Sequence, residues 1–283
     1  MNQSANKTDL SISTILGDIA IKIESAPASQ TDTATPIVFL HGLFLDKTLW
    51  DDFDTQLTHR THIYVDMPAH GQSSNVGRNW QLEECVTMLI NILDELELQH
   101  CIIVGHSWGG MTALRLAHQQ PDRVAGLLLL NTPWQMPSKR TQLGFQFQKL
   151  LTPWQRFYAA QAAKSLYTKQ MLTARPELIS DMQARLAKRP AREISRVLDA
   201  VILDPQDARS KLVAFSVPTV VAVGEADYVQ LPSEINPIYV ETHTLSGGHI
   251  SPHEASQEVQ KLLTEMLAKL EPNHEQANVM VTA

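Results

Sequence analysis

The sequence is poor in cysteine, and the two that it contains are Cys85 and Cys101. They form neither a CxxC pair nor the spacing of a metal finger, so nothing indicates a disulfide framework or a zinc site. Free thiols persist in reducing compartments, whereas secreted domains of this kind are usually cross-linked. We therefore expect a cytoplasmic protein.

Long apolar runs and runs of positive charge are also missing. No stretch approaches the ~20 apolar residues that span a bilayer. The segment Met1 to Thr8 is polar where a secretory signal would be apolar. The formal net charge is −7, and no Lys/Arg run is longer than Lys139–Arg140, whereas a nucleic-acid backbone requires a basic stripe. We expect a soluble protein with neither a membrane nor a nucleic acid as partner.

Apolar and charged residues, in contrast, are present in the proportions of a globular enzyme. They make up 43% and 19% of the chain, far from the composition of a disordered protein. A length of 283 residues exceeds the usual single domain, but α/β architectures often reach this size around one core. The length favours one domain with an insertion.

Short apolar runs alternate with longer stretches of helical period, which is typical of a mostly parallel sheet covered by helices. A helix is expected from Gln81 to Leu96, with its leucines on one buried stripe, and another should end near Leu270. Eight strands are predicted, at Leu10 to Ile15, Ile19 to Ile23, Ile37 to Leu40, Ile63 to Asp66, Ile102 to Gly105, Leu127 to Leu130, Thr219 to Val223 and Glu241 to Leu245.

Residues 134–209 contain no β-like run, and prolines interrupt their helical segments. This range is interpreted as a helical insertion after the sixth strand. Residues 1–133 and 210–271 would then form the core. Pro272 to Ala283 is polar and follows a helix stop, so we expect a disordered tail there.

Gly105-His106-Ser107-Trp108-Gly109 carries the chemistry. A serine hydroxyl is a weak nucleophile unless it is lifted clear of the backbone and hydrogen-bonded to a base. In a nucleophile elbow the serine occupies a strained strand-to-helix turn, and the flanking glycines let the strand and helix approach. An ordinary turn could have the same five letters. The apolar run before Ser107 and the helical run after it favour the elbow.

An elbow also needs donors for an oxyanion. The backbone N–H of Trp108 would start the helix after Ser107, where negative charge is stabilised. A second donor should come from the loop after the third strand, and the amide of Leu43 is the candidate. His41 in the same loop is interpreted as a brace, with general-base catalysis as its alternative role.

The acid and the base of such a triad follow the serine in chain order. Asp227 comes three residues after the glycine that ends the seventh strand, and Glu225 is its rival. His249 is the candidate base, because Gly247 and Gly248 let its loop fold over the active-site edge. His253 lies where the last helix should start and fits a capping or surface position better.

Together these residues resemble the α/β-hydrolase superfamily, in the serine-dependent group of enol-lactonases, small esterases, cofactor-free haloperoxidases and carbon–carbon bond hydrolases. The resemblance covers about residues 10–270. It rests on His41–Gly42 as the oxyanion loop, 66–73 as a D-x-P-G-H-G-x-S turn, 105–110 as the elbow, and 248–254 as a G-H-x-x-x-x-E ending. Two features depart from the pattern. Ala69 replaces the usual glycine, and the segment from Asp227 to His249 is short, which keeps Glu225 open as the acid.

The resemblance implies an eight-stranded, mostly parallel sheet flanked by helices, with residues 134–209 as a cap over the pocket. The aromatic side chains of Trp154, Phe157 and Tyr158 would then be pocket walls, unless they only pack the cap against the core. Their spacing does not distinguish the two.

The function expected from these residues is cleavage of a small-molecule carboxylic ester or lactone through an acyl-enzyme, with no metal or organic cofactor. Haloperoxidase or perhydrolase chemistry and a triad-dependent lyase are alternatives that use the same residues. A slow-turnover ligand-binding receptor is an alternative from another class. The sequence leaves the exact substrate and the oligomeric state open.

Overall fold

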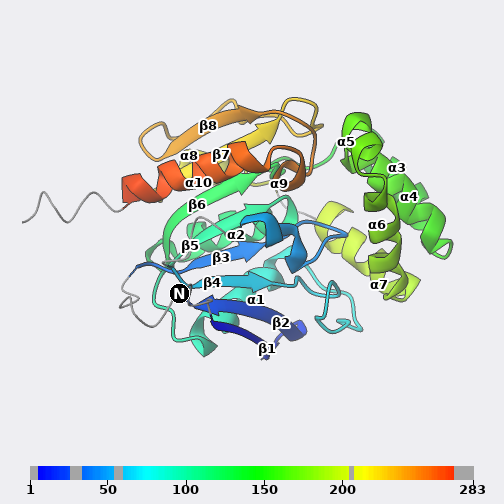
Figure 1. Ribbon diagram of the computed structural model, residues 1–283, viewed down its shortest axis with the longest axis horizontal. Coiled ribbons are helices and arrows are strands. Elements are labelled where there is room, and N and C mark those ends of the chain that lie inside the picture. The colour runs from blue at the N-terminus through cyan, green and yellow to red at the C-terminus, as the bar shows by residue number, and fades with distance from the viewer. Residues whose placement is uncertain (1–5, 26–33, 54–59, 204–206, 271–283) are drawn as a thin grey trace, which may run out of the picture.

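The computed structural model describes residues 6–25, 34–53, 60–203 and 207–270. The expected tail from Pro272 to Ala283 lies outside these ranges. An eight-stranded sheet with the order β1-β2-β4-β3-β5-β6-β7-β8 forms the centre (Figure 1). Its strands are β1 Asn6–Thr14, β2 Gly17–Ser25, β3 Ile37–Leu40, β4 His62–Val65, β5 Cys101–His106, β6 Val124–Leu130, β7 Thr219–Gly224 and β8 Val240–Leu245. The sequence predicted all eight.

Two pairings are antiparallel, β1 with β2 and β2 with β4, and the strands from β4 to β8 are parallel. The predicted bounds are wrong chiefly at β1, which begins at Asn6 rather than Leu10 and ends before Ile15. This strand lies at the edge of the sheet, where polar side chains such as Lys7 and Asp9 face solvent. A search for apolar runs therefore misses the polar residues with which the strand begins.

Helices cover both faces of the sheet. α1 (Leu82–Glu95) and α2 (Trp108–Gln119) bury their apolar side chains with one set of strand residues, including Val38 and Ile103. α10 (Ser256–Leu270) packs on the set that points the other way, including Phe39 and Val104. The alternation is that of strands buried on both faces. The predicted buried stripe of α1 is confirmed, because Leu82, Val86, Leu89 and Leu93 are all buried.

Between β6 and β7 the described residues contain helices and no strand. These are α3 Lys139–Lys149, α4 Gln155–Leu166, α5 Lys169–Ala174, α6 Glu177–Ala187, α7 Ala191–Leu198, a π-helical turn at Asp199–Leu203, and α8 Arg209–Val213. In Figure 1, α3 to α7 lie beyond one end of the sheet, whereas α8 lies beside the sheet near β7. None of the described helices has both the length and the apolar character needed to cross a bilayer. The division into a core and a separate cap stays a prediction.

Polar contacts hold these helices to the loops of the sheet. Arg185 of α6 pairs with Asp46 at 2.8 Å, and Arg189 donates to the carbonyl of Gly71 at 2.6 Å. At the other end, Thr168 donates its amide and its hydroxyl to the carboxylate of Glu254. The glutamate of the G-H-x-x-x-x-E pattern therefore anchors the start of α5.

Candidate active site

Ser107 occupies a sharp turn between β5 and α2, with φ 50° and ψ −113°. A non-glycine residue in this region is strained, and the surrounding structure must hold it there. Glycines make the turn fit. A Cβ on Gly105 would lie 2.6 Å from the backbone of Gly110, and one on Gly109 would lie 2.2 Å from the carbonyl oxygen of Leu40. The strand and the helix thus meet more closely than any other residue would allow.

Three side chains predicted from the sequence meet at this turn. Ser107 Oγ lies 2.9 Å from His249 Nε2, and His249 Nδ1 lies 2.9 and 3.0 Å from the two carboxylate oxygens of Asp227. These contacts require the Nδ1–H tautomer, with Nε2 free to accept from the serine hydroxyl. A hydrogen-bonded chain of this kind is able to activate a serine.

Asp227, and not Glu225, lies beside His249. The turn after β7 buries the Asp227 carboxylate completely, whereas the Glu225 side chain is exposed. Burial by itself would raise the pKa of Asp227, but hydrogen bonds from His249, Asn131 and the Val229 amide hold it below its ordinary value. The carboxylate is therefore ionised at neutral pH and can stabilise an imidazolium.

Asn131, which the sequence interpretation missed, supports the acid. It follows β6 directly, in a left-handed conformation with φ 49°, which asparagine tolerates better than most residues. Its Nδ2 donates to Asp227 at 2.7 Å and to the carbonyl of Gly248 at 3.1 Å. One side chain thus ties the acid loop to the histidine loop. The only signal in the sequence was a polar residue at the carboxyl end of a buried strand.

The two expected oxyanion donors lie on either side of Ser107. The amide of Trp108 is in the first turn of α2, where helix N–H groups have no intrahelical acceptor. Leu43 follows Gly42, whose added Cβ would lie 3.1 Å from Ser107 Cβ. Within the described ranges, neither the Leu43 nor the Trp108 amide has a hydrogen-bond acceptor. Both are available to a ligand.

Two buried histidines brace the loop that carries Leu43. His41 donates from Nδ1 to the Gly42 carbonyl and accepts the Met67 amide at Nε2, so both ring nitrogens are occupied. His70 accepts the Phe44 amide at 3.0 Å. Burial lowers the pKa of His41 and lowers that of His70 to about 3, so both rings are neutral. The interpretation of His41 as a brace rather than a base agrees with these contacts.

The turn at residues 66–73 is also structural. The Asp66 carboxylate accepts the backbone amides of Lys47 and Gln72, each at 2.8 Å. Ala69, which stands where the family pattern has glycine, keeps a left-handed φ of 58°. The departure noted in the sequence therefore leaves the turn intact, at the cost of local backbone strain of about 1 kcal/mol.

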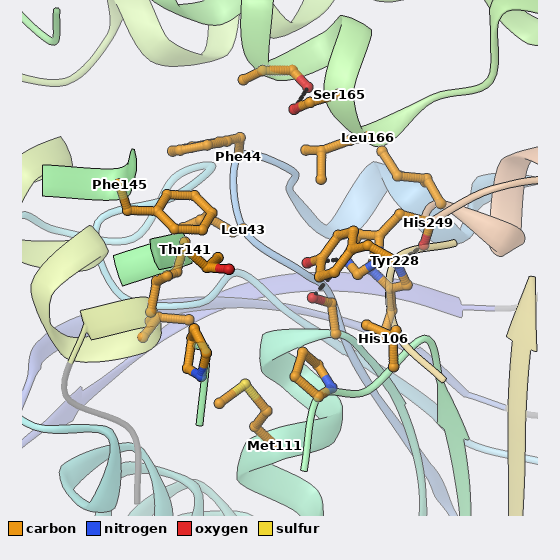
Figure 2. Close-up of a pocket in the computed structure, with 18 of the residues that line it drawn as sticks. Leu43, Phe44, His106, Met111, Thr141, Phe145, Ser165, Leu166, Tyr228 and His249 are labelled. Carbon is orange, nitrogen blue, oxygen red and sulfur yellow. Dashed lines mark hydrogen bonds between the residues drawn. The ribbon is translucent and has the colours of Figure 1, made fainter. Parts of the chain in front are cut away.

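A cavity of about 500 Å³ opens onto Ser107 and His249. Figure 2 shows Met111 below it, and Phe145 and Thr141 across it from His249. Among the residues that the structure describes, no Asp, Glu, Lys or Arg lines it. The largest apolar and aromatic ones are Leu43, Phe44, Leu45, Met111, Trp134, Phe145, Tyr158, Leu166, Ile202, Tyr228 and Ile250.

Of the three aromatic side chains expected as pocket walls, Tyr158 faces the cavity and the other two do not. Tyr158 is buried and lines the cavity. Trp154 and Phe157 are 64% and 54% exposed and do not line it. Trp154 caps α4, and Phe157 is rotated by about 100° from Tyr158 around the helix. Of these three side chains only Tyr158 points inward. The sequence interpretation missed two other aromatic lining residues of the same range, Trp134 and Phe145.

Tyr228 is a further residue that sequence reasoning missed. The segment 225–239 between β7 and β8 contains no helix, so it stays close to the sheet edge. Its Tyr228 ring stacks on His249, with centroids 4.7 Å apart and planes at 23°, and its hydroxyl lies 3.4 Å from Nε2 (Figure 2). The segment 225–239 thus has no helix, and it places the Tyr228 ring against the imidazole of His249.

The remaining candidates have other partners. His253 Nδ1 lies 2.8 Å from the hydroxyl of Tyr167 and does not contact Ser107. The thiols of Cys85 and Cys101 are buried, which raises the pKa of both. The described residues include no group of three or more His, Cys, Asp or Glu side chains placed to hold a metal ion.

Comparisons with known proteins agree with this architecture. A family model described as "alpha/beta hydrolase fold" matches residues 35–170. An sn-1-specific diacylglycerol lipase of Mus musculus is 38% identical over 102 residues, which are 35% of this chain and 33% of that protein. The first three curated relatives are aligned over only 38%, 33% and 26% of their own lengths.

Solved structures match over nearly the whole chain. A thermophilic esterase from Thermogutta terrifontis has a TM-score of 0.77 and 24% identity, covering 93% of this chain and 99% of that one. The enol-lactonase from Burkholderia xenovorans LB400 has a TM-score of 0.78 and 18% identity, covering 92% and 100%. At these identities the likeness shows the fold. The topology, the matched family model and these structures together show that the chain has the α/β-hydrolase fold.

Proposed function

We propose that this protein is a serine hydrolase that cleaves carboxylic esters or lactones through an acyl-enzyme. The observation that carries the proposal is the contact of 2.9 Å between Ser107 Oγ and His249 Nε2, with Asp227 on the other ring nitrogen. A serine in this setting can lose its proton to the imidazole while it attacks a carbonyl carbon.

In the proposed reaction, Ser107 adds to the carbonyl, and His249 takes the hydroxyl proton. Asp227 holds the ring and stabilises its cationic form. The amides of Leu43 and Trp108 stabilise the oxyanion, which is typically the largest single contribution to catalysis. His249 then protonates the leaving alkoxide, and a water molecule activated by the same histidine hydrolyses the acyl-enzyme.

The cavity supports an uncharged substrate. No charged side chain lies among the described lining residues, so a carboxylate or ammonium group on the substrate would lose its hydration there without gaining an ionic partner from them. Neutral polar side chains of Gln135, Gln148 and Thr141 remain available for hydrogen bonds. We propose that the groups on both sides of the scissile bond are neutral and mostly apolar.

A matched pair of esters tests both parts of the proposal. The p-nitrophenyl esters of butyric acid and of succinic acid differ mainly in a terminal carboxylate. We expect turnover of the butyrate with kcat/KM at least 100-fold above that of the hemisuccinate, and loss of both activities in Ser107→Ala.

Preference for the hemisuccinate would contradict the neutral pocket while leaving the mechanism intact. Failure to cleave esters and lactones, combined with bromination of a dimedone substrate in acetate, bromide and hydrogen peroxide, would contradict the hydrolase and favour the haloperoxidase.

A further inference from the structure

The outer sides of α3 and α4 expose an unusual amount of apolar surface. α3 buries none of its side chains. Soluble proteins normally cover such stripes, and large exposed apolar patches mark interaction sites. The side chains concerned are Leu143, Phe147, Leu150, Trp154 and Phe157, each between 54% and 66% exposed. We call this set, with the basic residues described next, the α3–α4 face.

The same segment is strongly basic. Residues 123–176 contain eight Lys or Arg and no Asp or Glu, in a chain whose net charge is −7. The side chains of Lys139, Arg140, Arg156 and Lys164 are exposed, and in the part of the chain that the structure describes none of these four has an ion-pair partner. Exposed positive charge and exposed apolar side chains therefore lie on or directly beside the same two helices.

This combination fits an anionic lipid surface better than another copy of the chain. Helices that lie in a membrane interface present Trp, Phe and Leu beside Lys and Arg, because the apolar groups enter the acyl boundary and the cations meet the headgroups. Two α3–α4 faces brought together would instead oppose like charges across the contact. We propose that the α3–α4 face docks the protein on anionic membranes.

The position of the cavity gives the docking a consequence. The two helices that carry the α3–α4 face also line the cavity, through Thr141, Phe145 and Gln148 of α3 and through Tyr158 and Leu166 of α4. Thr141, Phe145 and Leu166 are seen around it in Figure 2. A docked protein therefore has its cavity walls within one helix diameter of the lipid. The membrane contact itself does not depend on the proposed hydrolase activity.

Co-sedimentation of the full chain with vesicles tests the docking. We expect binding to vesicles of phosphatidylcholine with phosphatidylglycerol and little binding to phosphatidylcholine alone. Each basic residue near such a surface strengthens binding about fivefold, so Arg140→Gln/Arg156→Gln/Lys164→Gln should weaken it about a hundredfold. The control for charge is Lys261→Gln on α10. The Lys261 side chain is 76% exposed, and this variant should bind vesicles as wild type does.

The apolar part has its own variant and control. Leu143→Ser/Phe147→Ser should weaken vesicle binding at least tenfold while turnover of a water-soluble ester stays unchanged, because neither side chain lines the cavity. Ile238→Ser removes an apolar side chain that is 82% exposed elsewhere on the surface, and it should leave binding unchanged.

Trp154 provides a local probe. The other four tryptophans are buried, so contact at the α3–α4 face should shift the emission of this one to shorter wavelength when anionic vesicles are added. The shift should be absent in Trp154→Phe. Equal binding to neutral and anionic vesicles, or wild-type binding by both the apolar and the charge variants, would overturn the proposal. A dimer in solution that Leu143→Ser/Phe147→Ser dissociates, without any vesicle binding, would assign the face to a second copy.

Discussion

The strands and loops at the sheet edge differ from α3, in the helical segment between β6 and β7, in how far their side chains are buried. At the sheet edge, all six residues of β5 and all six of β7 are buried. Hydrogen bonds join His249 to both Ser107 and Asp227. α3, in contrast, has no fully buried side chain and exposes Leu143 and Phe147. The buried and hydrogen-bonded edge can fix atoms for chemistry, whereas α3 supplies side chains to the cavity wall. Changes at the edge should alter the rate, and changes in the helices should alter preference or stability.

The largest expected effect is at the triad acid. Asp227→Asn should lower kcat about 10⁴-fold, because the histidine then loses its tautomer and the partner of its cation. Glu225→Gln at the exposed neighbouring position should retain wild-type activity. Steady-state kinetics on p-nitrophenyl butyrate measure both. Loss of activity in the second variant alone would move the acid to Glu225.

A smaller loss of activity is expected at Asn131, which contacts Asp227 at the same edge. Asn131→Gly keeps the left-handed backbone conformation and removes the bonds to Asp227 and Gly248. We expect kcat to fall about tenfold, the scale of losing one hydrogen bond of about 1–2 kcal/mol to a charged group. KM should stay unchanged. A change confined to KM would mean that Asn131 shapes the cavity and does not position the acid.

Two phenylalanines of α3 allow the role of the cavity wall to be distinguished from that of the outer surface. Phe145→Ala enlarges the cavity, so the ratio of kcat/KM for a branched acyl ester over the linear butyrate should rise about tenfold. Phe147→Ala, two residues along the helix and 63% exposed, should leave the ratio as it is. Equal shifts in the two variants would show that α3 acts through its overall placement instead of through Phe145.

The attachment of the helices should depend on pH. Burial alone would raise the pKa of Asp46, but Arg185 lowers it to about 2 from an ordinary value of 3.8. A depressed carboxyl pKa stabilises the fold above the unfolded value, and this stabilisation is lost as pH falls through the folded one. Asp46→Asn should therefore lower the melting temperature at pH 7, with a difference from wild type that shrinks between pH 4 and pH 2 in calorimetry. A constant difference would contradict the ion pair.

The contrast between the regions also explains what the sequence could predict. Buried parallel strands leave unbroken apolar runs, and the loops after them carry Ser107, Asp227 and His249 in a fixed chain order, so the strands and the three side chains were found. Asn131 and Tyr228 were missed, because hydrogen bonds and stacking between loops distant in the chain leave no local pattern. In the helices, spacing alone did not tell Tyr158 from Phe157. The whole-chain charge of −7 likewise averages over the acid-free stretch at 123–176.

The most direct test of the central claim is covalent labelling of the nucleophile. After incubation with a fluorophosphonate probe, intact mass spectrometry of the wild-type protein should show one adduct, and peptide mapping should locate it at Ser107. The Ser107→Ala variant should gain no mass. An adduct on the Ser107→Ala variant, or a wild-type adduct at another residue, would contradict the assignment of Ser107.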